Sequence, residues 1–234
     1  MAFVFSGMNK RRWIVGTACA AAFVVFALIA SVAASPSAAA PAPRAEARRQ
    51  TIVVLGDSLS AEYGLPRDTG WVALLRKRLA DERIDYSVAN ASISGDTTSG
   101  GRARMPELMA RLKPSIVIVE LGANDALRGV PLSTTQDNLR TIIEQAQQGR
   151  AKVLLVGMYV PANYGPAYTQ RFHGLYGELA RDMNVKLVPF LLAGIENRQD
   201  MFQSDQMHPT QQAQPFLLDN VWPVLAPLLR PHGR

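Results

Sequence analysis

The chain has 234 residues, of which 48% are hydrophobic and 19% are charged, and its formal net charge is +6. This length and composition predict one packed domain and exclude disorder over most of the chain. The basic residues form no cluster interleaved with aromatic side chains, and the single cysteine, Cys19, lies in the N-terminal apolar stretch. The composition therefore gives no indication of a nucleic-acid surface. It also excludes a cysteine nucleophile, a disulfide or a thiolate metal site in the rest of the chain.

The N-terminus has the pattern of an export signal. Three basic residues, Lys10-Arg11-Arg12, precede an uncharged apolar run over residues 13–34, and small residues follow this run. A basic start, an apolar middle and a small-residue end predict a signal peptide over residues 1–40, and hence a periplasmic or secreted protein. About 20 apolar residues can also cross a bilayer, so the alternative is an inner-membrane anchor formed by residues 13–34.

Short apolar runs then alternate with stretches of helical spacing. Residues 41–50, rich in Pro, Ala and Arg, are predicted to be a linker to a domain over residues 51–234. We expect strands at residues 51–55, 85–90, 115–121, 152–158 and 186–191. We expect helices at residues 71–79, 106–112, 133–148, 168–182 and 211–229. A strand followed by a helix, repeated about five times, predicts an α/β fold in which helices cover both faces of a parallel sheet.

The ends of two of these helices have sequence signals of their own. Ser133 and Gln136 have the spacing of a capping box, and Gly149 follows the end of the same helix. The last helix contains three prolines, which we expect to bend or divide it.

Polar residues follow the first three expected strands. Residues 56–60, 90–96 and 122–125 are rich in Gly, Ser, Asn and Asp, although the strands before them are apolar. An open parallel sheet binds its ligands beyond the carboxyl ends of its strands. The sequence therefore predicts a site built from these three segments at one edge of the sheet.

A serine and a histidine are candidates for nucleophilic chemistry at this edge. Ser58 follows the first strand, and a serine hydroxyl becomes a good nucleophile when a neighbouring base takes its proton. We expect His173 and His232 at the surface, because one lies in a helix and the other in a C-terminal tail. His208 lies three residues after Asp205, a spacing that lets the carboxylate accept the ring N–H and fix the tautomer. Ser58, His208 and Asp205 are therefore the candidate nucleophile, base and acid.

Attack on a carbonyl also needs N–H groups that bind the developing oxyanion. The candidates are the backbone N–H groups of Ser58 and Gly95 and the side-chain amide of Asn124. Taken alone, each of these segments is also typical of a turn or a helix cap. Their order along the chain, at positions where the sheet places a site, favours the catalytic interpretation.

Four segments together resemble the signature of the SGNH (GDSL) hydrolases: GDSLS at residues 56–60, Gly95, GAND at residues 122–125, and Asp205 to His208. The resemblance extends from residue 51 to the C-terminus and is greatest to a bacterial periplasmic branch of multifunctional thioesterases, lysophospholipases and arylesterases. It implies a flavodoxin-like, three-layer α/β/α sandwich with a five-stranded parallel sheet, and neither a metal nor a cofactor. It also assigns Ser58 as nucleophile, Gly95 and Asn124 as oxyanion donors, and Asp205 with His208 as acid and base.

The same resemblance implies an acyl site in the loop after the fourth strand. The candidate substrate-binding residues there are Val160, Pro161 and Tyr164, although Val160 stands where the branch leads us to expect leucine. Further apolar residues follow the strands, and of these we expect Ile93 and Met158 to be core residues. Three arginines are either solvated or meet a phosphate head group: Arg67, Arg102 and Arg128.

These residues predict a monomeric serine esterase that hydrolyses acyl esters and thioesters through an acyl-serine intermediate. Its partners would be small acyl esters, thioesters or lysophospholipids rather than nucleic acid, with a membrane nearby only through such a substrate or an uncleaved N-terminus. One alternative is a carbohydrate acetyl-esterase with the same catalytic residues. The other is a non-catalytic binding protein on the same fold, which is disfavoured because every chemical position is filled.

Overall fold

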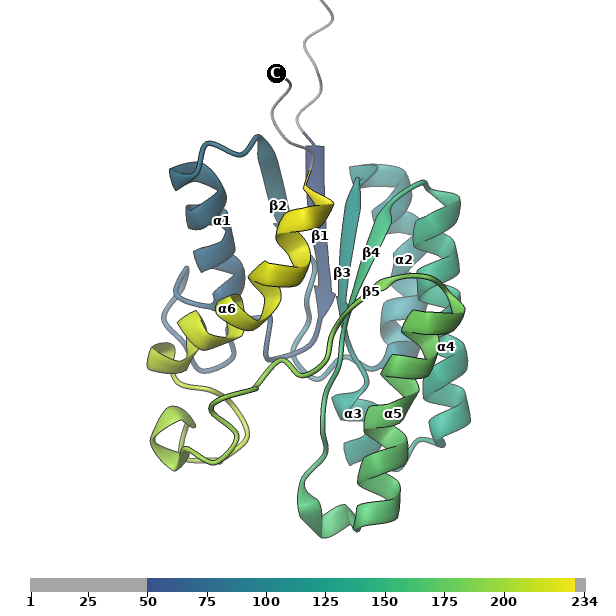
Figure 1. Ribbon diagram of the computed structural model, residues 1–234, viewed down its shortest axis with the longest axis vertical. Helices are drawn as coiled ribbons and strands as arrows, with labels where there is room; N and C mark the ends of the chain where they lie inside the picture. The colour runs from purple at the N-terminus through teal and green to yellow at the C-terminus, as the bar shows by residue number, and fades with distance from the viewer. Residues whose placement is uncertain (1–49, 230–234) are drawn as a thin grey trace, which may run out of the picture. The chain divides into compact units, whose positions relative to one another are not determined.

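The computed structural model describes residues 50–229, except for the side chain of Ala162. A five-stranded sheet in the order β2-β1-β3-β4-β5, with every pair of neighbours parallel, lies between two layers of helices (Figure 1). The strands are β1 (Gln50–Gly56), β2 (Tyr86–Asn90), β3 (Ile116–Glu120), β4 (Lys152–Val156) and β5 (Lys186–Val188). This order is that of flavodoxin-like sheets, so the predicted α/β/α class and five-stranded sheet are confirmed.

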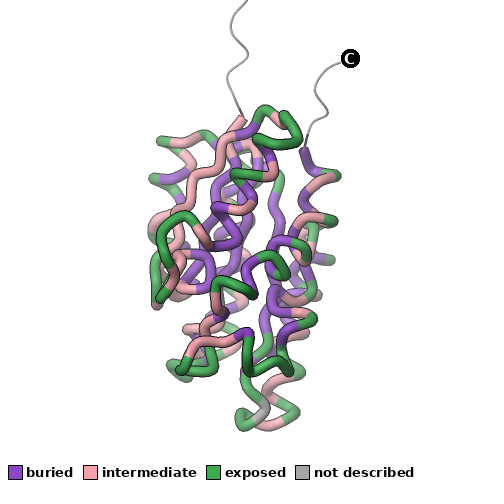
Figure 2. The backbone as a smooth tube through the Cα atoms, turned by 90° about the vertical axis from the view of Figure 1, so that its left-hand side faces the viewer, coloured by how far each residue is buried: buried purple, intermediate pink, exposed green. Residues whose placement is uncertain are grey.

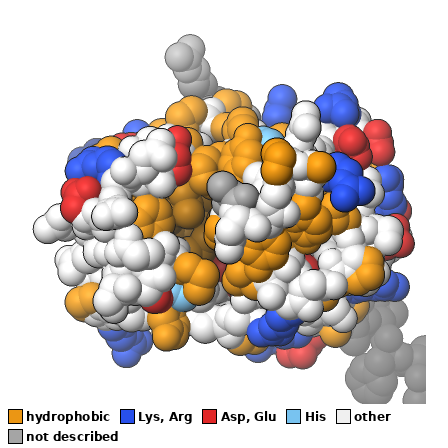
Figure 3. Space-filling model, turned by 90° about the horizontal axis from the view of Figure 1, so that it is seen from below, with side chains coloured by type: hydrophobic (Ala, Val, Ile, Leu, Met, Phe, Trp, Pro, Cys, Tyr) orange, Lys and Arg blue, Asp and Glu red, His pale blue; other side chains and the backbone are white. Residues whose placement is uncertain are grey.

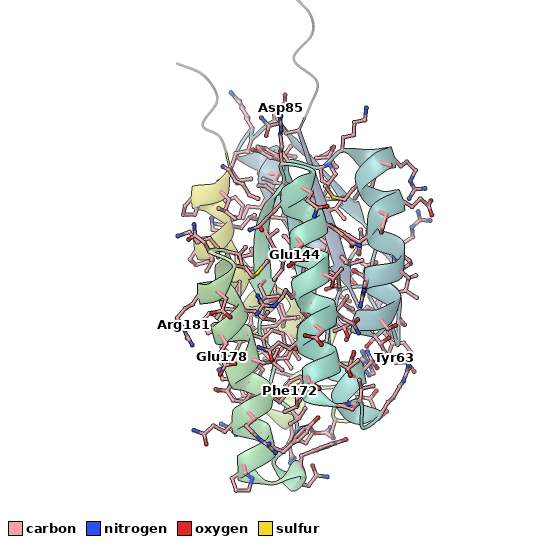
Figure 4. The ribbon with its side chains drawn as sticks, turned by 90° about the vertical axis from the view of Figure 1, so that its right-hand side faces the viewer. Tyr63, Asp85, Glu144, Phe172, Glu178 and Arg181 are labelled. Carbon is pink, nitrogen blue, oxygen red and sulfur yellow. The ribbon has the colours of Figure 1, made fainter. Side chains whose placement is uncertain are left out.

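Helices cover both faces of the sheet. One face carries α1 (Trp71–Asp81) and α6 (Gln214–Leu225), and the other carries α2 (Thr98–Leu112), α4 (Leu132–Gln148) and α5 (Pro166–Asp182). The shorter elements are α3 (Ala123–Leu127) and the 3-10 turns η1 (Ala162–Tyr164), η2 (Gln199–Met201), η3 (Gln211–Ala213) and η4 (Ala226–Leu228). In Figure 4, Glu178 and Arg181 lie on the outer side of α5, whereas Phe172 on the same helix is fully buried.

The central strands are buried on both faces, which explains their unbroken apolar runs. Residues 52–55 of β1 and residues 116–119 of β3 have no exposed surface, and Figure 2 shows the strands as the buried centre of the fold. A strand covered by helices on both sides needs apolar residues at every position, not at alternate ones. The carboxyl ends of all five strands therefore meet at one edge of a rigid sheet.

One helix begins eight residues earlier than predicted. α2 starts at Thr98, where the side chain of Thr97 accepts a hydrogen bond from the Gly100 N–H, and Pro106 lies inside the helix. Gly100 and Gly101 make this first turn weakly helical by propensity. The turn forms because Gly101 packs closely against the side chain of Leu121, a tertiary contact that local sequence does not reveal.

Other element boundaries also differ from the prediction. α4 begins at Leu132 after Pro131 and has no side-chain cap, so the predicted capping box of Ser133 with Gln136 is wrong. Proline at this position fixes the entry of the chain with its own restricted φ. The stop at Gly149 is confirmed. The last helix is divided into η3, α6 and η4, as its prolines predict.

Gln50, predicted as the last linker residue, already belongs to β1, because it pairs in register with Tyr86 of β2. The predicted signal peptide or anchor, the rest of the predicted linker, Cys19 and His232 lie outside the described residues. Within residues 50–229, no helix combines the length and apolar character that a bilayer crossing requires.

Candidate active site

The loops at the carboxyl edge of the sheet surround a hollow. Figure 3 looks onto this edge and shows a depression with many hydrophobic side chains around it. Ser58 lies in the turn that follows β1, where the N–H groups of Ser60 and Ala61 bond back to the carbonyl of Asp57. This turn holds Ser58 at the strand end, partly exposed to the hollow.

Ser58, His208 and Asp205 are connected in series by hydrogen bonds. His208 Nε2 lies 2.9 Å from Ser58 Oγ, and His208 Nδ1 lies 2.6 Å from Asp205 Oδ2. Because Nδ1 donates its proton to the carboxylate, Nε2 is left free to accept the proton of the serine hydroxyl. The structure thus brings together residues that lie 150 positions apart in the sequence.

The loop that carries His208 is closed by its own backbone. Phe202 and Pro209 form an antiparallel bridge, and the Gln203 N–H donates to the carbonyl of His208 at 2.8 Å. On its other side, the imidazole contacts the ring of Tyr63, with 4.4 Å between the ring centroids. These contacts fix the position of the imidazole before a substrate arrives.

Asp205 is held as a carboxylate. The backbone N–H of His208 is the largest of the effects that lower the pKa of Asp205 to about 2, and the imidazole and the Met207 N–H act in the same direction. Both N–H groups donate to Oδ1, at 3.0 and 2.9 Å, while Oδ2 faces the imidazole. A carboxylate held in this way keeps its charge over the pH range in which an imidazole titrates.

The candidate oxyanion donors lie in turns at the ends of three strands. Gly95 has a φ of +77°, which strongly favours glycine, and Arg128 donates to its carbonyl at 2.8 Å. Asn124 lies in the first turn of α3, which the sequence analysis did not predict, and its Nδ2 donates to Asp57 Oδ2 at 2.9 Å. This bond orients the amide at the cavity wall, where Asn124 and Ser58 both lie.

Two buried acids behind these donors were missed by the sequence analysis. Asp57 and Glu120 have 1% and 0% exposed surface, and Asp57 lies between Glu120 and Asn124. Burial is the largest cause of the raised pKa of each acid, and the pKa of Asp57 rises to about 6. The available signal was Glu120 itself, an acid that ends an otherwise apolar strand.

The raised pKa of Asp57, about 6 against an ordinary 3.8, has a consequence for stability. Between about pH 4 and pH 6 the folded chain binds more protons at this site than the unfolded chain, so the free energy of unfolding falls as the pH rises. Asp57→Asn removes this titration. We therefore expect the free energy of unfolding of the variant, relative to that of the natural chain, to be higher at pH 7 than at pH 4. Urea unfolding at both pH values measures this difference.

The surface variant Asp182→Asn is the control for a general effect of charge. An equal stability difference for Asp57→Asn at both pH values would contradict the titration of Asp57. Asp205 contributes with the opposite sign, because its lowered pKa stabilises the fold above about pH 4 and this contribution is lost as the pH falls towards 2.

The hollow is a cavity of about 710 Å³ with a largely apolar wall. Val160 and Pro161 line it, as expected, together with Tyr159, Phe190 and other apolar residues from the loops after β4 and β5. Tyr164 lies outside this wall, because it belongs to η1 and stacks on Tyr168 of α5, with 5.8 Å between the ring centroids. Its role as a substrate-binding residue therefore stays a prediction, which the lining of this cavity does not support.

Three further expectations have mixed outcomes. Met158 is buried, as expected, and also lines the cavity. Ile93 is 50% exposed, contrary to its expected place in the core, because it lies in the loop after β2 rather than under a helix. His173 is half-buried rather than at the surface, because its ring stacks on Tyr159, with 3.7 Å between the centroids.

The three arginines are found in different settings. The side chain of Arg67 is 93% exposed, Arg102 donates to Asn138, and Arg128 donates to Gly95. Within the part of the chain that the structure describes, no group of three or more His, Cys, Asp or Glu side chains is placed to hold a metal ion.

A serine, an imidazole and a carboxylate in series, at the carboxyl edge of a parallel α/β/α sheet, are the arrangement that serine hydrolases use. Comparison with known proteins agrees with this class. Residues 54–214 match the GDSL-like Lipase/Acylhydrolase family. The chain therefore belongs to this family of hydrolases, and the predicted resemblance and enzyme class are confirmed.

Individual relatives cover most of the chain. The chain is 53% identical to Esterase TesA of Pseudomonas aeruginosa over 79% of its own length and 92% of that protein. It is 40% identical to Thioesterase 1/protease 1/lysophospholipase L1 of Escherichia coli, over 78% of its length and 86% of that protein. A crystal structure of the psychrotrophic esterase EstA from Pseudoalteromonas, inhibited by monoethylphosphonate, is 38% identical, with a TM-score of 0.74 and coverage of 77% and 98%.

Proposed function

We propose that the chain is a serine esterase in which Ser58 is the nucleophile, His208 the general base and Asp205 the orienting acid. The observation that carries this proposal is the continuous hydrogen-bonded path from Asp205 Oδ2 through the imidazole to Ser58 Oγ. No further group is needed to explain why a serine at the end of β1 would be reactive.

The reaction follows from this path. His208 Nε2 takes the proton of Ser58 as Oγ bonds to the ester carbonyl carbon, and the carbonyl oxygen becomes an oxyanion. The backbone N–H groups of Ser58 and Gly95 and the Asn124 amide are the donors that bind it. The imidazolium then gives its proton to the leaving alcohol or thiol, which leaves an acyl-Ser58. Water, deprotonated by His208, then attacks this acyl group. The bond from the acyl carbon to Ser58 Oγ breaks, Oγ takes the proton back from the imidazolium, and the carboxylic acid is released.

The cavity wall indicates the substrate class. A volume of about 710 Å³ lies within the range of about 300–1,000 Å³ that small-molecule sites occupy. Its largely apolar wall suits an acyl chain or an aryl group better than a sugar, whose hydroxyls need polar partners. The names of the esterase and thioesterase relatives agree with acyl esters and thioesters as substrates of this chain.

We expect the protein to act outside the cytoplasm, because its first 40 residues have the pattern of a signal peptide. In that location lysophospholipids and other esters are more accessible than thioesters of coenzyme A. N-terminal sequencing of the exported protein distinguishes a cleaved signal peptide from an anchor over residues 13–34.

The acyl preference depends on one aromatic side chain in the wall. Tyr159 lines the cavity and is packed between the rings of His173 and Phe190, at centroid distances of 3.7 and 4.8 Å. Tyr159→Ala removes apolar contact from a long acyl chain, and such a contact is worth about 1–3 kcal/mol. We expect kcat/KM for a nitrophenyl octanoate to fall about tenfold or more, while that for the acetate stays within about twofold.

A panel of nitrophenyl esters from acetate to laurate measures this profile. Tyr164→Ala is the matched control, because Tyr164 has a similar exposure but lies outside the cavity wall. An equal effect of both substitutions on octanoate would show that the wall does not select the acyl group. A sharp preference of the natural chain for acetate would instead favour the carbohydrate acetyl-esterase.

A further inference from the structure

Glu120 is a buried acid that the reaction above does not use. It ends β3, whose other residues are all aliphatic, and it has no exposed surface. Burying an ionisable group in such a place costs several kcal/mol unless the group is neutral or well paired. An acid buried despite this free-energy cost has a role that an apolar residue at position 120 would not fill.

The surroundings of Glu120 favour its neutral form. Among the described residues, no Lys, Arg or His forms an ion pair with it, and its Oε1 has no hydrogen-bond partner. Burial is the largest cause of its raised pKa, and the neighbouring charge of Asp57 acts in the same direction.

Other acidic groups near Glu120 and Asp57 also disfavour a second negative charge there. Asp96 raises the pKa of Asp57, and Tyr176, whose hydroxyl donates to the Leu121 carbonyl, is itself affected by both buried acids and by Asp125. The nearby imidazole of His208 lowers the pKa of Asp57. Together these groups allow one negative charge on the pair and oppose a second.

Contacts hold the Glu120 carboxyl in one orientation. Its Oε2 accepts from the Ser60 hydroxyl at 2.7 Å and from the Asp57 N–H at 3.3 Å, and the indole of Trp71 donates to the same hydroxyl. Gly56 adjoins it so closely that a Cβ at this position would lie 2.7 Å from Oε2. The carboxyl therefore has no alternative position in the native packing.

Asp57 connects Glu120 to Asn124, the candidate oxyanion donor. Asp57 Oδ2 accepts from Asn124 Nδ2 at 2.9 Å, while its Oδ1 accepts from the Leu59 N–H. A primary amide has two N–H groups, so the bond to Asp57 uses one and fixes the direction of the other. Loss of Glu120 would leave the Asp57 N–H and the Ser60 hydroxyl without their acceptor, and so loosen Asp57 and the Asn124 amide that bonds to it.

We propose that Glu120 is a positioning residue that aligns the amide of Asn124 with the oxyanion by holding the backbone of Asp57, whose carboxylate accepts from that amide. This inference rests on the proposed function, in which Asn124 binds the oxyanion. It assigns Asp57, which directly follows β1, and Glu120, which ends β3, to transition-state stabilisation rather than to substrate binding. Their removal should therefore change kcat and leave KM nearly unaltered.

A double-mutant cycle between Glu120 and Asn124 tests the proposal. Glu120→Leu keeps the size of the side chain and removes its polar atoms. We expect it to lower kcat for a nitrophenyl ester about 10–100-fold, with KM within about twofold. In the Asn124→Ala background the same change should have almost no further effect on kcat, because the donor that Glu120 aligns is already absent.

Two further variants separate positioning from folding. Glu120→Gln, of the same shape, should keep kcat within about threefold, since its amide oxygen can still accept from the Asp57 N–H and the Ser60 hydroxyl. Gln214→Leu removes another buried polar side chain, one that accepts from the Trp71 N–H, and should lower the melting temperature without changing kcat. If Glu120→Leu does not fold, Asp57→Ala removes the acceptor of the Asn124 amide and should show the same loss and the same dependence on Asn124.

The outcomes are distinguishable. An equal loss of kcat from Glu120→Leu in both backgrounds would overturn the positioning role, as would a Glu120→Gln variant as impaired as Glu120→Leu. If Asn124→Ala alone kept full kcat, the oxyanion assignment in the proposed function would fail instead.

Discussion

Ser58→Ala is expected to lower kcat for ester hydrolysis by on the order of 10⁵–10⁶-fold while the fold is kept. The hydroxyl oxygen of Ser58 is the atom that bonds to the substrate carbon, and the methyl group of alanine is not a nucleophile. Ser58 contacts the cavity rather than the core, so its loss leaves the packing of the sheet unaltered. The measurement is kcat for a nitrophenyl ester, together with the melting temperature of both proteins.

His208→Ala should cause a loss of the same order, because the hydroxyl then has no base 2.9 Å away. The double variant should be no worse than either single one, since the two side chains act as a unit. Ser133→Ala, a surface serine on α4, is the control. Retained turnover in Ser58→Ala, or losses that multiply in the double variant, would exclude this pair as nucleophile and base.

Asn124→Ala is expected to lower kcat about 10²–10³-fold, which corresponds to about 3–4 kcal/mol of lost transition-state stabilisation. The amide bonds to an oxygen that carries full charge only in the transition state, so KM should change little. Its geometry is fixed beforehand by the 2.9 Å bond to Asp57, so little reorganisation is needed during the reaction.

Asn124→Asp provides the matching contrast, because it replaces the donor with a negative charge where the oxyanion forms. It should be at least as damaging as alanine at pH 8. Asn163→Ala, an exposed residue in η1, is the control for the loss of an amide elsewhere. A rise in KM with unchanged kcat would mean that Asn124 binds the ground state and is not an oxyanion donor.

The features that could be predicted from the sequence share one physical cause. Strands covered on both faces must be apolar throughout, so β1 and β3 stood out, and the polar residues that end them marked the site. The sheet rule placed Ser58, Gly95 and Asn124 at one edge without any knowledge of distances. Asp205 and His208 were within reach of each other because only three positions separate them.

The remaining features depend on contacts between distant segments. The connection from Glu120 through Asp57 to Asn124 joins the end of β3, the turn after β1 and a short helix, segments whose contact the local sequence does not indicate. The stacking of Tyr159 on His173 arises because α5 returns beside the loop after β4. Spacing within a loop does not show which side chains face the cavity, so the sequence could not separate Tyr164 from Val160 and Pro161, which line it.

Covalent labelling tests the central claim most directly. A p-nitrophenyl phosphonate ester reacts with an activated serine as it would with the ester carbonyl, releases nitrophenol, and leaves a stable phosphonyl adduct. Mass spectrometry of the digested protein is expected to find one adduct per chain, on the peptide that contains Ser58, and none in His208→Ala on the same timescale. An adduct on another residue, or rapid labelling that does not need His208, would contradict the account.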